Sequence, residues 1–126
     1  MADGIWTLVE KLAKKTYAGK LDWQRTAEDD VYQVAFPGYA VRLFTRHGSQ
    51  GGLDIIVQVL DQNGTLVEEI TDVDIPNSTQ LDPIEAFGYM NDLYKAARRK
   101  AMGVDAALKS IIESLDREEN DDDAPF

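Results

Sequence analysis

The residues best suited to hold a small molecule are two arginines and a phenylalanine in one predicted strand. Arg42, Phe44 and Arg46 are spaced by two, so their side chains point to the same face of that strand. Guanidinium groups beside an aromatic ring can bind a phosphate or another planar anion. Arg98 and Arg99 would complete a small pocket for an anionic ligand, such as a nucleotide, if the C-terminal helix or a second copy brought them close.

The same arginines have an alternative role that needs no ligand. Asp54 and Glu69 fall on the same predicted sheet face or its rim, where Arg42 and Arg46 would meet them in ordinary cross-strand charge pairs. The pattern alone does not choose between the two roles.

The other reactive residues form no recognisable catalytic or metal site. The chain has one histidine and no cysteine, so the usual zinc sites cannot be assembled. His47 lies two residues before Ser49 in a predicted loop. The two residues are only close in sequence, and no third residue that would orient the histidine in a catalytic triad can be identified. Asp72, Asp74 and Asp82 could hold magnesium or calcium, but they lack the spacing of a calcium loop and also suit turn caps. We therefore expect no catalytic residue, no metal and no cofactor.

Charge and length limit the classes of partner. The 126 residues fit one domain, and the net charge is −10, of which −5 lies in the last eleven residues. An acidic chain lacks the dense basic surface of nonspecific nucleic-acid binding, whereas it suits a basic protein partner or serves solubility. No apolar run reaches the roughly 18 residues of a membrane helix. The N-terminus lacks a signal-peptide pattern, so a cytoplasmic location is expected.

Apolar periodicity predicts one helix followed by two hairpins. Residues 3–19 have helical spacing, with Asp3 as N-cap and Gly19 as the stop. Residues 21–30 are interpreted as a connection from which Trp23 folds back onto the core. Strands 32–36 and 39–46 alternate around Pro37-Gly38, which pairs Val34 with Val41. Strands 53–61 and 66–70 follow around Asn63-Gly64, a turn in which both positions require positive φ.

The turn of the second hairpin predicts its register, and the reverse face of the predicted sheet is partly apolar. The two-residue turn pairs Val57 with Ile70 and Asp61 with Leu66, on the side that faces the core. The reverse face of the sheet is not fully polar, because five apolar side chains point there: Ala40, Phe44, Ile56, Leu60 and Val67. A helix, a loop or another chain would have to cover them.

Two helices and a tail complete the predicted fold. Asp82, Pro83 and Glu85 mark the start of the second helix, and Gly103 stops it. Asp105 can cap a short third helix that has apolar residues at 108, 111, 112 and 115. The prediction is an α+β domain over residues 1–115, with a four-stranded antiparallel meander and helices mainly on one face. Residues 116–126 are expected to be an acidic disordered tail.

The C-terminal helix pair carries a resemblance. The block from Leu93-Tyr94 through Ala97-Arg98-Arg99 and Gly103-Val104-Asp105 to Ala107-Leu108 resembles the ends of small uncharacterised bacterial or phage proteins. The surroundings of Trp6 and Trp23 agree with this. The resemblance implies a bacterial or phage cytosolic protein and implies no activity.

These observations favour a non-enzymatic interaction protein of the adaptor, inhibitor or immunity type. It would bind another, basic protein through its acidic surface or through Phe44, Ile56, Leu60 and Val67 on the reverse sheet face. The same residues could instead form the interface of a homodimer. A small anionic-ligand binder is the alternative function, and an enzyme ranks last.

Overall fold

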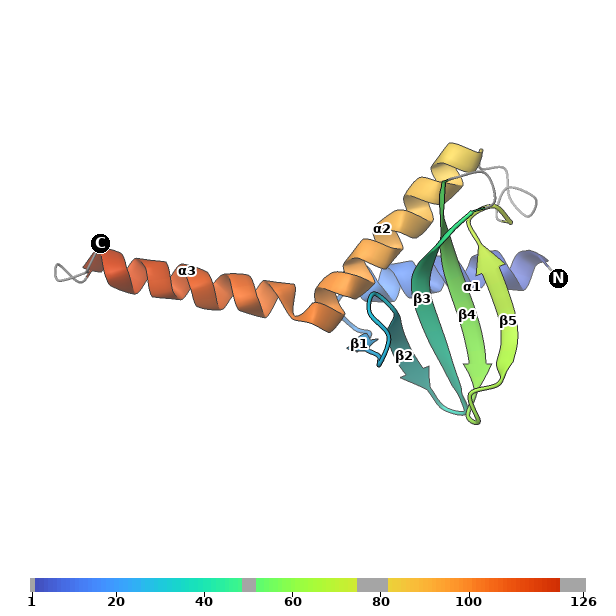
Figure 1. The fold of residues 1–126 in the computed structure, drawn as a ribbon, viewed down its shortest axis with the longest axis horizontal. Helices are drawn as coiled ribbons and strands as arrows, with labels where there is room; N and C mark the ends of the chain where they lie inside the picture. The colour runs from blue at the N-terminus through green and yellow to red at the C-terminus, as the bar shows by residue number, and fades with distance from the viewer. Residues whose placement is uncertain (1, 49–51, 75–81, 121–126) are drawn as a thin grey trace.

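The computed structural model describes residues 2–48, 52–74 and 82–120, and it has an α+β architecture (Figure 1). A five-stranded antiparallel sheet follows one helix and precedes two more. The elements are α1 (Ala2–Tyr17), β1 (Gln24–Arg25), β2 (Tyr32–Phe36), β3 (Tyr39–His47), β4 (Leu53–Asp61), β5 (Leu66–Thr71), α2 (Pro83–Met102) and α3 (Val104–Asn120).

The sheet contains one strand more than the four predicted. Its order is β1-β2-β3-β4-β5, with every neighbouring pair antiparallel. The additional strand β1 lies in the stretch interpreted as a connection, where Gln24 pairs with Gln33 and Arg25 with Tyr32. Two residues are too few to display the alternation by which a strand is identified in a sequence.

The first hairpin has the predicted register. Phe36 pairs with Tyr39 and Val34 with Val41, and Gly38 takes the left-handed conformation with φ 77°. Phe36 and Tyr39 are nevertheless exposed, because they lie at the turn end of the strands.

The second hairpin departs from prediction at its turn. Val57 pairs with Ile70 as expected, but Leu66 pairs with Leu60 and not with Asp61. Only Gly64 of the Asn63-Gly64 pair has positive φ, at 83°. The connection is a three-residue loop closed by Gly64, and the register shift leaves one extra residue in β5. The shift moves Leu66 from the face that covers the core to the opposite face.

The hydrophobic core lies between one face of the sheet and helices α1 and α2. Figure 1 shows both helices behind the sheet and none in front of it. The core joins Val9, Leu12 and Ala13 of α1 and Met90, Leu93 and Ala97 of α2 to alternate residues of β2 to β5. Trp23 is buried as predicted, and its indole Nε1 donates a 2.9 Å hydrogen bond to Thr16 Oγ1.

Local signals at the helix ends explain most of the boundaries. Gly19, with φ 72°, ends α1, and the Lys20 amide donates back to the Lys15 carbonyl, as in a Schellman cap. Asp82 and Glu85 form the predicted capping box of α2. The predicted N-cap of α1 is wrong, because the helix already begins at Ala2 and Asp3 lies within its first turn.

The third helix is longer and less packed than predicted. α3 runs from Val104 to Asn120, so Asp105 lies in its first turn and residues 116–120 are helical. Residues 121–126 of the predicted tail lie outside the described part of the chain. Figure 1 shows α3 leaving the end of α2 and pointing away from the sheet, so it does not join the helices that cover the core.

None of the helices in the described ranges has the length and apolar character required to cross a membrane.

Candidate functional site

The sheet face turned away from α1 and α2, here called the open face, consists of cross-strand rows. The row nearest the two hairpin turns is apolar, and we call Ala35, Ala40, Leu60 and Leu66 the apolar row. The next row is polar and contains Gln33, Arg42, Gln58 and Glu69. The following row contains Phe44, Ile56 and Thr71, and a charged row with Arg46 and Asp54 ends the face.

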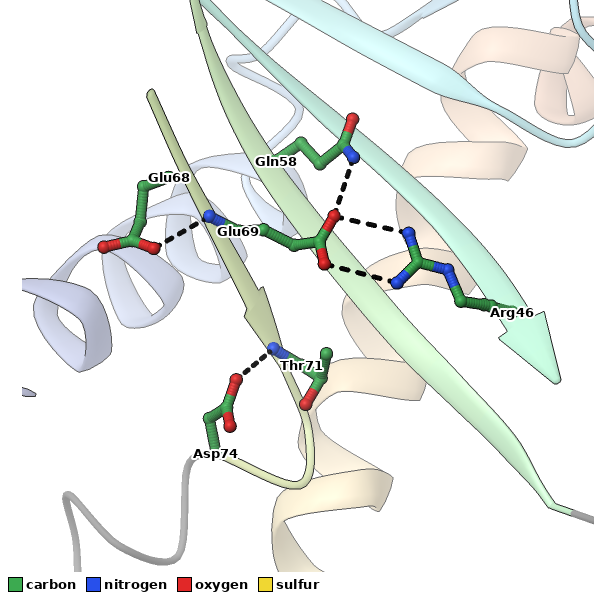
Figure 2. A network of polar contacts seen from close by, with 6 residues as sticks. All are labelled: Arg46, Gln58, Glu68, Glu69, Thr71 and Asp74. Atoms are coloured by element: carbon green, nitrogen blue, oxygen red, sulfur yellow. Dashed lines mark hydrogen bonds and ion pairs between the residues drawn. The ribbon is translucent and has the colours of Figure 1, made fainter. Parts of the chain in front are cut away.

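Arg46 and Glu69 form an ion pair that crosses strand β4 (Figure 2). Arg46 Nη1 and Nη2 lie 3.2 and 3.3 Å from the two carboxylate oxygens of Glu69, and Gln58 donates to the same carboxylate at 2.8 Å. The Arg46 guanidinium also lies 5.6 Å from the centroid of the Phe44 ring. Hydrogen bonds from Arg46 and Gln58 hold the pKa of the Glu69 carboxyl below its usual value.

The register explains what this pair covers. Arg46 is opposite Asp54 and Glu69 is opposite Gln58, so the line between their side chains passes over Ile56. Ile56 has no exposed surface although none of the helices in the described ranges packs on this face. The alternative role of Arg46, charge pairing, is therefore the arrangement present in the structure.

The other arginines of the predicted anion pocket do not join Arg46. Arg42 Nε donates to Gln33 Oε1 at 2.7 Å, within the polar row. Arg98 and Arg99 belong to α2, the helix that packs on the opposite face of the sheet. Arg99 Nη2 lies 2.6 Å from Asp105 Oδ1, and this ion pair joins the end of α2 to the start of α3.

A shallow hollow adjoins the apolar row at the hairpin ends. It encloses about 270 Å³. Ala40 and Leu60 of the apolar row line it together with Arg42 and the two aromatic residues of the first turn, Phe36 and Tyr39. The accessible apolar surface of the open face is thus concentrated beside the two turns.

The predicted partner-binding residues differ in accessibility. Ile56 and Leu60 are buried, Phe44 is half-buried and Val67 is 56% exposed. Leu66, which the predicted register placed on the core side, is 49% exposed and is paired with Leu60. The loop Gln62-Asn63-Gly64 is the only sequence signal for this shift, since three residues ending in glycine also fit a bulged hairpin.

The acids considered as metal ligands have structural partners instead. Asp72 is buried, and its Oδ1 accepts a 2.8 Å hydrogen bond from the Ile55 amide. Burial raises the pKa of the Asp72 carboxyl, the Ile55 bond opposes the rise, and nearby Asp54 adds to it. Asp74 accepts from the Thr71 amide, and Asp82 caps α2. Within residues 2–48, 52–74 and 82–120, no group of histidines and acids could hold a metal ion.

His47 ends strand β3, where it pairs with Leu53. Its sequence neighbour Ser49 lies outside the described residues. No family model, curated protein or solved structure matches the chain.

Proposed function

We propose that the protein is a non-enzymatic interaction protein that binds another protein through the hairpin end of its open face. The observation that carries the proposal is the apolar row, which crosses four strands on a face that neither α1 nor α2 covers. Ala35 and Leu66 of this row are exposed, whereas Leu60 is buried and Ala40 is half-buried. Exposed apolar side chains gathered on one side of a sheet are typical of surfaces that another molecule covers.

The shape of this surface suits a protein better than a small molecule. The hollow is open, and Ala40, Leu60 and Tyr39 are among the residues that line it. Binding energy between proteins is concentrated where a large side chain of one partner fills such a depression in the other. The partner is therefore expected to insert an aliphatic or aromatic side chain beside Tyr39.

The net charge of −10 favours a basic partner. At the hollow itself Asp61 and Arg42 both contribute to the lining, and Arg42 is bonded to the neutral Gln33. The expectation of a basic partner therefore rests on the acidic balance of the whole chain. Complementary rim charges mainly accelerate association and select among partners.

If the protein instead binds a small anion, binding should depend on Arg46 and Glu69 and not on the apolar row. It requires Arg46 to exchange Glu69 for a ligand, since that carboxylate already accepts both terminal nitrogens of the guanidinium. An anion that raised the melting temperature of the wild type, and raised it further in Glu69→Gln, would support this alternative over the proposal.

The test is quantitative affinity capture from a native lysate, using matched surface variants. Leu66→Lys places a charge in the apolar row at a position that is already half exposed, so the fold is retained. Ile84→Lys is the matched control, because Ile84 is 84% exposed on the first turn of α2. The proposal predicts at least one protein that is captured by the wild type and by Ile84→Lys and is lost with Leu66→Lys.

Capture that is equal for all three chains would contradict the proposed surface. Far-ultraviolet circular dichroism and urea unfolding of both variants serve as the check on folding. A partner recovered only below physiological salt would indicate charge attraction without a specific surface.

A further inference from the structure

A second apolar surface lies on α3, distinct from the open face. Its side chains repeat at intervals of three and four along one side of the helix and are each 48 to 56% exposed: Leu108, Ile111, Ile112 and Leu115. None of them belongs to the hydrophobic core or packs against it in the described part of the chain. Figure 1 shows the helix extending from the end of α2 with no other element beside it.

A helix with this composition needs a partner. α3 has 17 residues, only slightly more than the roughly 12–15 residues below which an isolated helix is marginally stable in water. In proteins most of a helix's stability comes from packing its apolar side, which in α3 has nothing described to pack on. Since no described residue covers this side of α3, a second molecule is the candidate partner.

We propose that α3 pairs with α3 of a second copy of this chain in an antiparallel arrangement. The two-fold axis would pass between Ile111 and Ile112, so Leu108 of one copy would face Leu115 of the other. Such a pairing is self-complementary, because each contact occurs twice. The interface differs from the open face, so the inference goes beyond the proposed function and does not depend on it.

The distribution of charge favours the antiparallel direction. Arg98, Arg99 and Lys100 lie just before α3, whereas residues 116–126 carry a net charge of −5. Asp105 already pairs with Arg99, and Arg98 interacts with the Tyr32 hydroxyl, which leaves Lys100 as the available cation of the three. Parallel helices would bring two acidic ends together, whereas antiparallel helices bring each acidic end toward the basic end of the other copy.

The flanks of the apolar side agree with the same register. Lys109 and Asp116 lie on one flank of the apolar side. In the proposed pair, Lys109 of one copy and Asp116 of the other are offset along the helix axis by about two residues, or ~3 Å. Ala107 and Ser114 lie on the other flank. Their small side chains allow the two backbones to approach closely, since interaxial distance depends on the side chains at the contact.

The size of the surface indicates a reversible dimer. Four half-exposed aliphatic side chains per copy bury less than the ~800 Å² per partner of a standard interface, which places the pair among weak or transient associations. We therefore expect monomer and dimer to exchange in the micromolar range.

Sedimentation velocity of the full chain, from about 1 µM to about 500 µM, measures this association over the range of weak interfaces. The wild type is expected to shift from monomer to dimer. Ile111→Lys, which changes an exposed residue outside the core, is expected to stay monomeric, while Ile84→Lys dimerises like the wild type. A wild type that stays monomeric throughout, or a dimer that survives Ile111→Lys, would overturn the proposal.

Cysteine cross-linking determines the direction, because the chain contains no cysteine of its own. In a glutathione buffer, an equal mixture of Leu108→Cys and Leu115→Cys is expected to give mainly the mixed disulfide. In the antiparallel pair two copies of residue 115 lie about seven residues, or ~10 Å, apart along the axis, beyond the reach of a disulfide. Preferential cross-linking of Leu115→Cys to itself would show a parallel pair and contradict the proposal.

The variants also separate this inference from the proposed function. Leu66→Lys is expected to leave dimerisation unchanged, and Ile111→Lys is expected to retain the captured protein partner. Loss of dimerisation in Leu66→Lys would show that the open face forms the dimer and would contradict the assignment to α3.

Discussion

Arg46 and Glu69 meet across strand β4 directly over Ile56. The ion pair crosses the middle of a sheet face on which none of the described helices packs, and Ile56, at the intervening position of β4, has no exposed surface. The accessible apolar surface is consequently displaced toward the hairpin turns, where Leu66 lies beside Leu60. The open face thus has a middle region occupied by the Arg46–Glu69 ion pair and a hairpin end where apolar side chains are accessible.

Removing Arg46 is expected to change the titration of Glu69. In the wild type the hydrogen bonds from Arg46 and Gln58 lower the pKa of the Glu69 carboxyl. Because a lowered pKa stabilises the fold above the unfolded-state pKa, this contribution is lost as the pH falls through the folded-state value. In Arg46→Gln the Glu69 pKa should rise toward its ordinary value, as measured by NMR titration of the side-chain carboxyl. An unchanged pKa would show that the pair is absent in solution.

Asp72 is expected to stabilise the junction of β4 and β5 by accepting the Ile55 amide. Asp72→Ala leaves that buried amide without an acceptor, at a cost of about 1–3 kcal/mol in the free energy of unfolding. Asp72→Asn keeps an acceptor oxygen and should cost less. Urea unfolding of both variants at neutral pH gives the comparison, and equal losses would exclude the hydrogen bond as the cause.

The pH dependence associated with Asp72 has the opposite sign to that of Glu69. Burial raises the pKa of Asp72 in the folded state above the value it has when unfolded, so the folded state binds the proton more tightly. The carboxyl of Asp72 therefore favours folding increasingly as the pH falls from its raised pKa toward about 3.9.

Comparison with Asp72→Asn isolates this effect, since the amide does not titrate. The difference in unfolding free energy between the wild type and Asp72→Asn should shift in favour of the wild type on acidification. A difference that is constant with pH, or that shifts toward the variant, is the contrary result.

Thr16 is expected to be essential for the buried position of Trp23. Its hydroxyl accepts the indole N–H at 2.9 Å and donates to the Leu12 carbonyl at 2.6 Å. Thr16→Val keeps the shape but leaves the buried N–H unpaired, which should cost about 1–3 kcal/mol in urea unfolding. Thr16→Ser retains the hydroxyl and is the control. Equal stability of the valine and serine variants would show that the bond contributes nothing.

Periodicity and turn chemistry were sufficient to predict most of the fold. Alternation around Pro37-Gly38 gave the first hairpin residue by residue, and the signals at Asp82 and Gly103 gave both ends of α2. The features that escaped prediction depend on tertiary pairing. Strand β1 is too short for a pattern, and the extra residue in β5 appears only once Leu66 is paired with Leu60.

The candidate site was predictable in its location and not in its details. Alternation placed Arg42, Phe44 and Arg46 on the reverse face correctly, but spacing cannot show that Glu69 reaches Arg46 over an intervening strand. The exposure of α3 was also beyond the sequence, because an amphipathic pattern has the same form whether the apolar side is covered by its own chain or by another.

The central claim, that the hairpin end of the open face binds a protein, is tested most directly by site-specific photo-cross-linking in cells of the source organism. A benzophenone amino acid replaces Leu66 in one chain and Ile84 in the other. The account predicts a discrete cross-linked species of higher mass from position 66 and none from position 84. The absence of any such species at position 66, or the same species at both positions, would contradict it.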